Sequence, residues 1–240
     1  MSALLATAGV DAWEECQGRT HSEVAVRLLQ LVQPEANRGQ LAAMSIGSRD
    51  RLLLEYRSET FGTDFELQTV CPNCGERLEL QASSDEFHRP RDAEREVHEW
   101  TDGQYRVKFR LPSSQDVVIA SRGAEMDEQY RRLWRRCTST TLEGHEIDPD
   151  LVPDEVRRRV EEAMLELDAQ AVVAMRLDCP ECGNAWDADF DVVPVLWAEF
   201  DRLVRQRLHD VHRLAETYGW SEETILNLSP ARRQFYLDLL

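Results

Sequence analysis

Positive charge is scarce in this chain of 240 residues, and long apolar runs are absent. Its 28 lysine and arginine residues stand against 45 acidic residues, so the net charge at pH 7 is −17. Nucleic-acid binding needs a basic surface that replaces phosphate counterions, so this charge argues against it. No uninterrupted apolar run approaches the roughly 18 residues of a transmembrane helix, which argues against a membrane-spanning role.

The chain also lacks the sequence motifs of common catalytic sites. It contains no phosphate-binding glycine loop, no Gly-x-Ser-x-Gly elbow and no His-Glu-x-x-His helix. His209 and His212 lie three residues apart, but no cysteine or acid at matching spacing completes a metal site. Acidic residues are so numerous that no catalytic pair stands out. We therefore expect no enzymatic activity.

The first ten residues lack the features of a secretory signal. They are apolar but contain no basic residue, and Asp11, Glu14 and Glu15 follow. Because a signal peptide begins with a positively charged region, we do not expect this protein to be exported to an oxidising compartment. Paired cysteines in this chain are then expected to be reduced thiols and not disulfides.

Against these absences, one pattern occurs twice: Cys-Pro-x-Cys-Gly, at residues 71–75 and 179–183. Two residues between thiolates let both sulfurs face one cation, and the glycine can adopt the positive φ that completes the turn. Two such motifs supply four thiolates, which close a tetrahedral zinc site and make the metal structural. We predict one Zn²⁺ per chain, with the ligands Cys71, Cys74, Cys179 and Cys182.

A redox site is another interpretation of the paired cysteines, and it carries less weight. A redox Cys-x-x-Cys normally occurs once, beside a βαβ pattern, and neither copy has that context. Cys16 and Cys137 have no paired partner and are expected to be ordinary part-buried thiols.

Residues 65–70 and 173–178 lead into the two motifs as strands, so each motif is expected at a hairpin tip, as in a zinc ribbon.

Between the motifs, the sequence predicts a hairpin followed by helices. Residues 96–101 and 104–111 flank Asp102-Gly103, a type I′ turn signal, and we expect this hairpin to share the small sheet of the ribbon. Ser113 and Asp116 form a capping box for a helix that breaks at Gly123. The remaining expected elements of this stretch are a polar loop at residues 138–149 and a helix from Pro153.

Helices are predicted on both sides of the ribbon. The N-terminal ones cover residues 22–32, capped by Ser22, and residues 48–62. A long amphipathic helix runs from Pro194 to a stop at Gly219, because apolar residues recur every three or four positions. Two short helices, capped by Ser221 and Ser229, complete the chain.

These elements predict an α+β fold: a split four-cysteine zinc ribbon with a small antiparallel sheet, a helical insertion, and helical N- and C-terminal segments. We expect one integrated domain. Its parts are an N-terminal helical segment (1–62), the first knuckle with the β-hairpins (63–112), the helical insertion (113–170), the second knuckle (171–193) and the C-terminal helical segment (194–240).

The order of several segments resembles a family of T-even-type phage baseplate proteins, with relatives in contractile tails and phage-tail-like injection systems. The resemblance covers the chain from about residue 40 to its end. The segments that carry it, besides the two cysteine motifs, are Ser48-Arg49-Asp50-Arg51 with Leu52-Leu53-Leu54, Phe61-Gly62, Leu111-Pro112-Ser113 with Asp116, Leu133 to Cys137, Asp168-Ala169-Gln170-Ala171, Trp186, and Tyr218-Gly219-Trp220-Ser221 to Ala231-Arg232-Arg233 with Tyr236-Leu237.

This resemblance implies a non-enzymatic protein needed for assembly of a baseplate or hub, with other baseplate or tail proteins as partners. From the net charge and the lack of long apolar runs we expect no nucleic-acid or membrane partner, and we expect no small-molecule substrate. We expect the protein in the cytoplasm of the producing bacterium. The resemblance leaves open whether it is incorporated in the assembled particle or leaves as a chaperone, and whether a phage or a host-encoded particle is built.

The last residues of the chain are unusually apolar. Residues 235–240 read Phe-Tyr-Leu-Asp-Leu-Leu, and such groups must pack on this protein or on another. We expect the segment 197–240 to dock a baseplate partner, with closure of the protein's own core as the alternative. The expected partner-binding residues are Trp220, Arg232, Arg233, Phe235 and Tyr236.

Two functions of other classes remain as alternatives. Zinc ribbons often bind nucleic acid, so a zinc-ribbon nucleic-acid-associated factor is the first, and its net charge of −17 counts against it. The second is an enzyme with an open metal position. A helix-turn-helix at the C-terminus is disfavoured by the acidic pair Glu222-Glu223.

Overall fold

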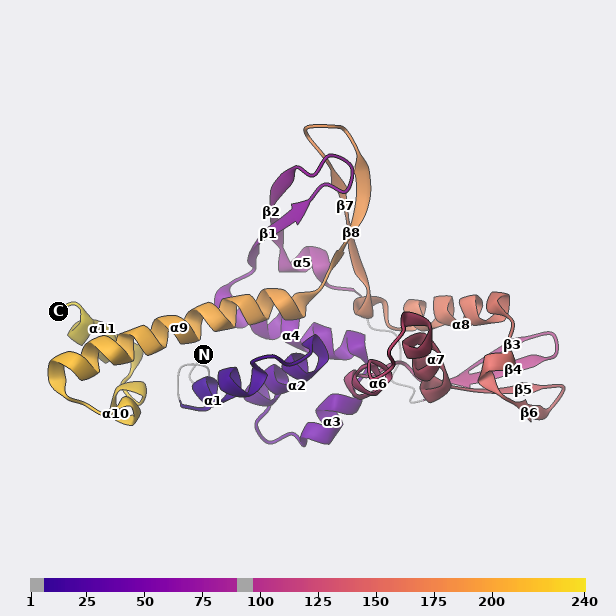
Figure 1. The fold of residues 1–240 in the computed structure, drawn as a ribbon, viewed down its shortest axis with the longest axis horizontal. Coiled ribbons are helices and arrows are strands. Elements are labelled where there is room, and N and C mark those ends of the chain that lie inside the picture. The colour runs from indigo at the N-terminus through magenta and orange to yellow at the C-terminus, as the bar shows by residue number, and fades with distance from the viewer. Residues whose placement is uncertain (1–6, 90–96) are drawn as a thin grey trace. The chain divides into compact units, whose positions relative to one another are not determined.

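The computed structural model describes residues 7–89 and 97–240 (Figure 1). They fall into two compact units. The first combines residues 1–36 with 193–240, and the second comprises residues 37–192. Mixed helices and small antiparallel sheets confirm the predicted α+β class. Within the described residues, no helix is both long and apolar enough to cross a membrane.

The first unit is helical, with the two ends of the chain packed together. Trp13 donates its indole N–H to the Asp201 carboxylate over 2.7 Å, which joins the N-terminal helices to the long one. Leu28, Phe200 and Ile225 are fully buried in this unit. The unit contains α1 (Thr7–Cys16), α2 (His21–Val32), α9 (Val192–Tyr218), α10 (Glu222–Leu226) and α11 (Pro230–Leu237).

The predicted caps of these helices are mostly found where expected. Gly219 follows the long helix with a φ of 68°, and Ser221 and Ser229 cap the two short ones. The cap of α2 is Thr20 and not Ser22, because Thr20 accepts the Glu23 N–H while Glu23 reaches back to the Thr20 N–H. Ser22 is the second residue of the helix and is buried.

The second unit contains three separate antiparallel sheets. Two are hairpins, β1 (Asp64–Val70) with β2 (Arg77–Ser83) and β7 (Val173–Asp178) with β8 (Ala185–Phe190). The third has four strands in sequence order, β3 (His98–Asp102), β4 (Tyr105–Phe109), β5 (Thr138–Leu142) and β6 (His145–Ile147). The helices of the second unit are α3 (Arg38–Ala43), α4 (Ile46–Phe61), α5 (Ser84–Phe87), α6 (Ser114–Ala120), α7 (Met126–Cys137) and α8 (Asp154–Leu167), with short 3₁₀ turns η2 (Pro149–Leu151) and η3 (Ala169–Ala171).

Two sequence-based expectations for the middle of the chain are wrong. The central hairpin does not share a sheet with the ribbon. Residues 138–149 are not a loop, because β5 pairs with β4 there and β6 pairs with β5. The alternation in β5 is carried by hydroxyls, with Thr138 and Thr140 buried, so an apolar period was not visible. Threonine nevertheless favours strands because it is β-branched.

The turn of the central hairpin is shifted by one residue from its expected place. Asp102 pairs with Tyr105, so Gly103 and Gln104 form the turn. Gly103 has a φ of 55°, which a residue without Cβ adopts at no steric cost. The expected strand start at Glu96 and the first six residues of the apolar N-terminus lie outside the described residues.

The four-stranded sheet packs one face against α7 and α8. Val107 and Phe109 of β4 contact Trp134 of α7 and Val156 and Val160 of α8, and all five are buried. Trp134 also donates its indole N–H to the Pro149 carbonyl over 3.0 Å. Burial of an aromatic ring with its polar atom satisfied is favourable, so this core fixes the sheet to both helices.

Candidate metal centre

The two Cys-Pro-x-Cys-Gly motifs form matching knuckles at the tips of the two hairpins (Figure 1). In the first, the Cys71 N–H donates to the Glu76 carbonyl and the Gly75 N–H donates to the Cys71 carbonyl. In the second, Cys179 and Gly183 repeat both bonds at nearly the same lengths. Gly75 and Gly183 have φ angles of 77° and 70°, so the predicted positive-φ turns are present.

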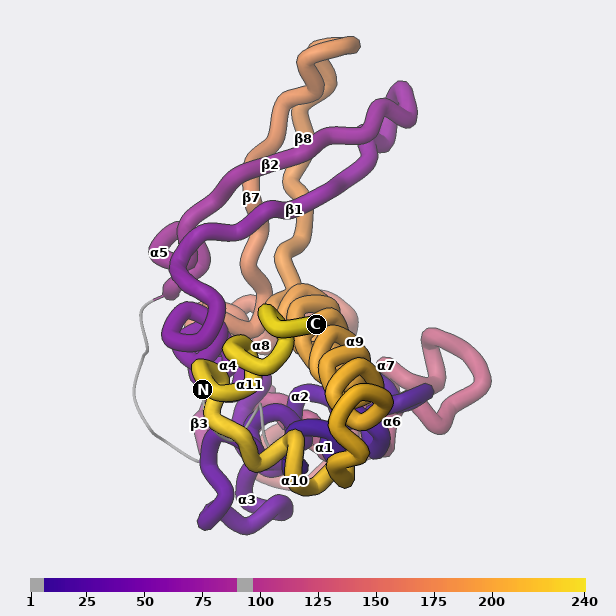
Figure 2. Tube along the Cα trace, turned by 90° about the vertical axis from the view of Figure 1, so that its left-hand side faces the viewer, coloured from indigo at the N-terminus to yellow at the C-terminus, as the bar shows by residue number. Residues whose placement is uncertain are grey.

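The hairpins run side by side up to their tips (Figure 2), which brings cysteines 105 positions apart into contact. All four sulfurs lie within 4.8 Å of one another. The Cys71 and Cys182 Sγ atoms are 3.7 Å apart, and those of Cys74 and Cys179 are 3.6 Å apart. Four sulfurs bound at about 2.3 Å to a tetrahedral zinc lie about 3.8 Å apart, so the donor set fits that ion.

The surroundings of the sulfurs differ from one thiol to the next. The Asn73 side-chain amide and the Asn184 backbone N–H lower the pKa of Cys182 to about 6. The pKa of Cys71 is also lowered, chiefly by the Cys74 backbone N–H. At Cys74 the Glu76 backbone N–H lowers the pKa, but desolvation and the neighbouring thiols outweigh it and raise the pKa to about 12. A bound cation would favour the thiolate form of these sulfurs.

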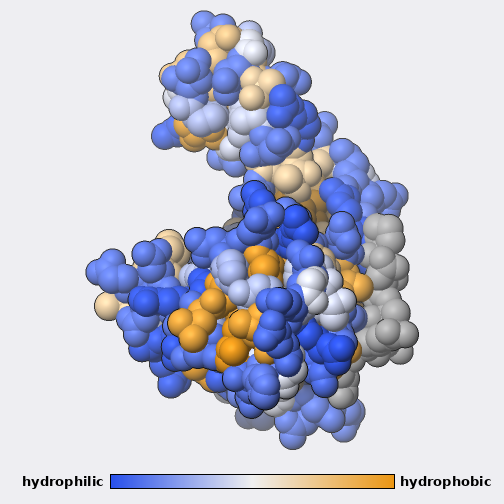
Figure 3. Space-filling model, turned by 90° about the vertical axis from the view of Figure 1, so that its right-hand side faces the viewer, coloured by the Kyte–Doolittle hydropathy of each residue, from blue (hydrophilic) through white to orange (hydrophobic). Residues whose placement is uncertain are grey.

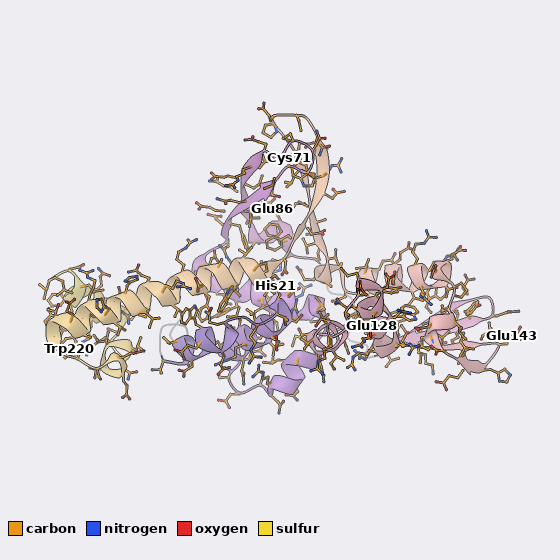
Figure 4. The ribbon with its side chains drawn as sticks, in the orientation of Figure 1. His21, Cys71, Glu86, Glu128, Glu143 and Trp220 are labelled. Atoms are coloured by element: carbon orange, nitrogen blue, oxygen red, sulfur yellow. The ribbon has the colours of Figure 1, made fainter. Side chains whose placement is uncertain are left out.

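Cys71 and Cys179, the first cysteine of each knuckle, are buried, whereas Cys74 and Cys182 are exposed. Cys71 is seen near the tip of the β1–β2 hairpin in Figure 4. Asn73 adds a bond between the knuckles, because its side-chain amide lies 3.5 Å from the Cys182 sulfur. No sequence signal identified this residue, since its role depends on the opposite knuckle.

At the other end of the ribbon, three phenylalanines join the two hairpins. Phe87 stacks on Phe190 with ring centroids 3.7 Å apart, and Phe65 meets both rings edge-on at 5.2 and 5.5 Å. Phe65 and Phe87 are fully buried. The Arg57 guanidinium lies 3.8 Å from the centre of the Phe65 ring, a cation–π contact that ties this cluster to α4. We call Phe65, Phe87, Phe190 and Arg57 the aromatic base.

Several segments that carry the family resemblance contact one another at the start of α4, the helix that precedes β1 in the sequence. The Arg49 guanidinium donates to the Ser114 hydroxyl over 2.9 Å and pairs with Asp50. The Asp168 carboxylate accepts the Gly47 N–H over 2.9 Å. A Cβ on Gly47 would lie 2.2 Å from that carboxylate, so only glycine allows this approach.

The predicted partner-binding residues lie at the far end of α9, in the first unit. Trp220, just beyond α9 (Figure 4), stacks on Tyr218 at 4.8 Å and meets Tyr236 edge-on at 4.9 Å. Phe235 is 62% exposed and contacts Tyr236. Arg232 is exposed, but Arg233 is only 1% exposed and faces Asp210 of α9 at 3.8 Å.

Comparison with known proteins assigns a family to most of the chain. The family model described as "T4 bacteriophage base plate protein" matches residues 17–193. This range contains both knuckles and the aromatic base, and it ends near the start of α9. No curated protein and no solved structure matches the chain. Because the match covers well over half of its length, the chain belongs to the T4 bacteriophage base plate protein family.

Proposed function

We propose that this chain is a non-enzymatic structural or assembly protein of the baseplate of a contractile phage tail or phage-tail-like particle. The observation that carries the proposal is the cluster of four thiols, contributed by two hairpins far apart in a chain of the baseplate family. A metal held there cross-links segment 63–112 to segment 171–193. A protein built around such a cross-link presents fixed surfaces to its neighbours in an assembly.

The metal is a single structural Zn²⁺ bound by Cys71, Cys74, Cys179 and Cys182. Soft thiolate ligands favour Zn²⁺, Cu⁺ and iron–sulfur clusters, and paired Cys-x-x-Cys knuckles at hairpin tips are typical of zinc. Four protein ligands leave no coordination position for a substrate or a catalytic water. The ligand set thus supports a structural role and argues against catalysis at this site.

Metal analysis of the purified protein tests this proposal. Inductively coupled plasma mass spectrometry is expected to find one zinc per chain, and Cys74→Ser is expected to reduce that content at least tenfold. Cys137→Ser is the matched control, since Cys137 is buried in α7 away from the knuckles. Folded protein without zinc, or with iron in its place, would contradict the assignment.

The C-terminal helices provide the surface that binds a baseplate partner. Supporting observations are the aromatic contacts among Tyr218, Trp220 and Tyr236 and the exposure of Phe235 beside Arg232. Aromatic residues and arginine are enriched at the energetic centres of interfaces. Arg233 is not part of the proposed surface because it is buried. Leu239 and Leu240, both exposed, extend the apolar area.

Point variants test this surface without opening the core of the first unit. Truncation after Ser229 would remove the buried Arg233 and Leu237, so Phe235→Ser and Leu239→Ser are the better changes. In cells that make the particle, these variants are expected to keep their melting temperature but to lose at least tenfold in co-purification with baseplate proteins. Glu216→Ser, an exposed change on α9, is the control. Unchanged co-purification would refute the surface.

Mass spectrometry of purified particles distinguishes the two modes of action. A permanent component is found at fixed stoichiometry, whereas a chaperone is found only with intermediates in the cytoplasm. Either result is compatible with the structural or assembly role. Absence from both particles and intermediates would refute it.

A further inference from the structure

An apolar groove lies in the second unit, between α7 and α8. It has a volume of about 430 Å³. Trp134 and Cys137 of α7 and Met164 of α8 line it, and Ile46 and Val172 also contribute apolar side chains. Figure 3 shows one face of the molecule, on which hydrophobic side chains gather between polar ones.

Side chains at the edge of the groove are exposed although they are apolar. Leu165 is 46% exposed, Val172 is 56% exposed and Tyr130 is 40% exposed. Exposed apolar side chains that cluster around a groove mark a binding surface more often than the same residues scattered singly. The groove lies within one unit, so its shape does not depend on the first unit.

The charge of the groove indicates what fills it. Among the residues that line it, the charged ones are Glu161 and Asp168, and both are acidic. Asp168 is engaged by Ser45 and Gly47. Glu161 accepts one hydrogen bond, from the Tyr130 hydroxyl over 2.5 Å, so it has acceptor capacity left. Arg157, the cation next to Tyr130, donates to the Asp150 carbonyl and pairs with Asp154.

We propose that this groove binds an amphipathic helix of a partner protein, with apolar side chains between α7 and α8 and a lysine or arginine at Glu161. A helix fits a groove formed by two helices because its side chains at i, i+3, i+4 and i+7 form one apolar stripe. A basic side chain next to the stripe complements an acidic edge on a chain of net charge −17. The protein then has two binding surfaces, one in each unit.

Methyl NMR of the full chain tests the groove directly. Of its five methionines, Met164 lines the groove, whereas Met175 lies on β7 in the ribbon and serves as an internal reference. The probes are two synthetic helical peptides with the same leucines at i, i+3, i+4 and i+7, one flanked by lysine and arginine and the other by glutamate. The basic peptide is expected to shift the Met164 signal and leave Met175 unchanged, with at least tenfold tighter binding than the acidic peptide.

Two variants separate the apolar and the charged parts of the proposal. Val172→Ser removes an apolar side chain from an exposed position of the edge without adding a charge. It is expected to weaken binding of both peptides at least threefold without changing the melting temperature. Glu161→Gln keeps an acceptor for Tyr130 and is expected to abolish the preference for the basic peptide. Met164 shifts that are absent, or equal for both peptides, overturn the proposal. Shifts that depend on protein concentration without peptide overturn it in favour of a second copy of this chain.

Discussion

The two ends of the ribbon are held together by different kinds of interaction. At the tip, four thiols lie within 4.8 Å of one another, and two of the four cysteines are exposed. At the aromatic base, Phe65 and Phe87 are fully buried and Arg57 covers one ring. Between them, the inner-facing residues Leu67 and Leu177 are only partly buried.

From this difference we expect that the tip and the aromatic base of the ribbon can open separately. The tip buries little apolar surface, so we expect it to open without the proposed metal, whereas the base is stabilised by the same burial that stabilises any core. Metal binding should therefore control the outer part of the hairpins alone. The following four predictions break or sharpen this comparison.

Loss of one ligand should have the largest effect, and it should be local. In Cys74→Ser the metal is lost, and binding free energies of structural zinc in peptides are about 10–16 kcal/mol. Amide hydrogen exchange near Leu78 and Leu177 is expected to increase at least a thousandfold, while amides near Phe65 and Phe190 stay protected. Equal loss of protection at both ends would show that the metal holds the whole ribbon.

Truncation of a side chain in the aromatic base should have the next largest effect. It should lower the free energy of unfolding of the whole second unit. Phe87→Ala leaves a cavity among Phe65, Phe190 and the end of α5, and removal of a buried phenylalanine costs about 3–5 kcal/mol. Urea unfolding measures the loss. The control, Val70→Ala, changes a residue that is 54% exposed on the strand that leads to the tip, and we expect a change under about 0.5 kcal/mol.

A change of pH should affect the two ends in opposite directions. Protons compete with the metal for thiolates, so acid weakens the tip. On α4, which also carries Arg57 of the aromatic base, burial raises the pKa of Asp50 to about 6, although Arg49 opposes the rise. Because this folded-state pKa lies above the ordinary value of 3.8, the stability contributed by Asp50 is complete below about pH 4 and is lost as pH rises through about 6.

Urea unfolding of metal-free Cys74→Ser at pH 7 and pH 5, with and without Asp50→Asn, measures the Asp50 contribution, because the pKa of Asp168 is also raised. The variant that keeps Asp50 is expected to gain roughly 1 kcal/mol more at pH 5, since somewhat under half of the about 3 kcal/mol for a shift of roughly two pKa units falls between these pH values. Asp116 does not interfere in this range: burial raises its pKa, but Arg110 and Ser113 hold it well below its usual value. Asp50→Asn should remove the gain. A metal-free variant that loses stability at pH 5 would rule out this assignment.

Removal of an exposed ion pair between the two ends should have the smallest effect. Arg176 and Asp187 face each other across β7 and β8 at 3.4 Å, and both are mostly exposed. Exposed pairs contribute about 0–1 kcal/mol, so Arg176→Ala is expected to change stability by less than about 0.5 kcal/mol. A loss above about 1 kcal/mol would mean that polar pairs, and not the metal alone, hold the outer hairpin.

Local elements could largely be predicted from the sequence, because their signals are short-range. The knuckle glycines, the Ser113–Asp116 capping box and the stop at Gly219 each act within a few residues, and the structure has all three. One wrong prediction was also local in origin. Thr20 and Ser22 are both capable caps, and the reciprocal capping box with Glu23 selects Thr20.

The long-range pairings could not be predicted. Hydroxyl-rich residues 138–142 were expected in a loop because the partner that makes them a strand, β4, ends 29 positions earlier, where Phe109 pairs with Thr138. The aromatic base joins Phe65 and Phe87 to Phe190, and no spacing connects these residues. The burial of Arg233 could not be predicted either, because it depends on packing near Asp210 of α9.

By itself, the sequence determined the paired cysteine knuckles, the α+β class and the family resemblance, because each depends on residue types at fixed short spacing or in a fixed order. Only the tertiary structure decided that the tips of the two hairpins lie together and that Phe87 and Phe190 stack at the aromatic base. It also decided that α7 and α8 leave an apolar groove with an acidic edge. The physical reason is that burial and close contact arise between segments far apart in the chain. Their free energy depends on shape and on what surrounds each side chain, which a local pattern does not encode.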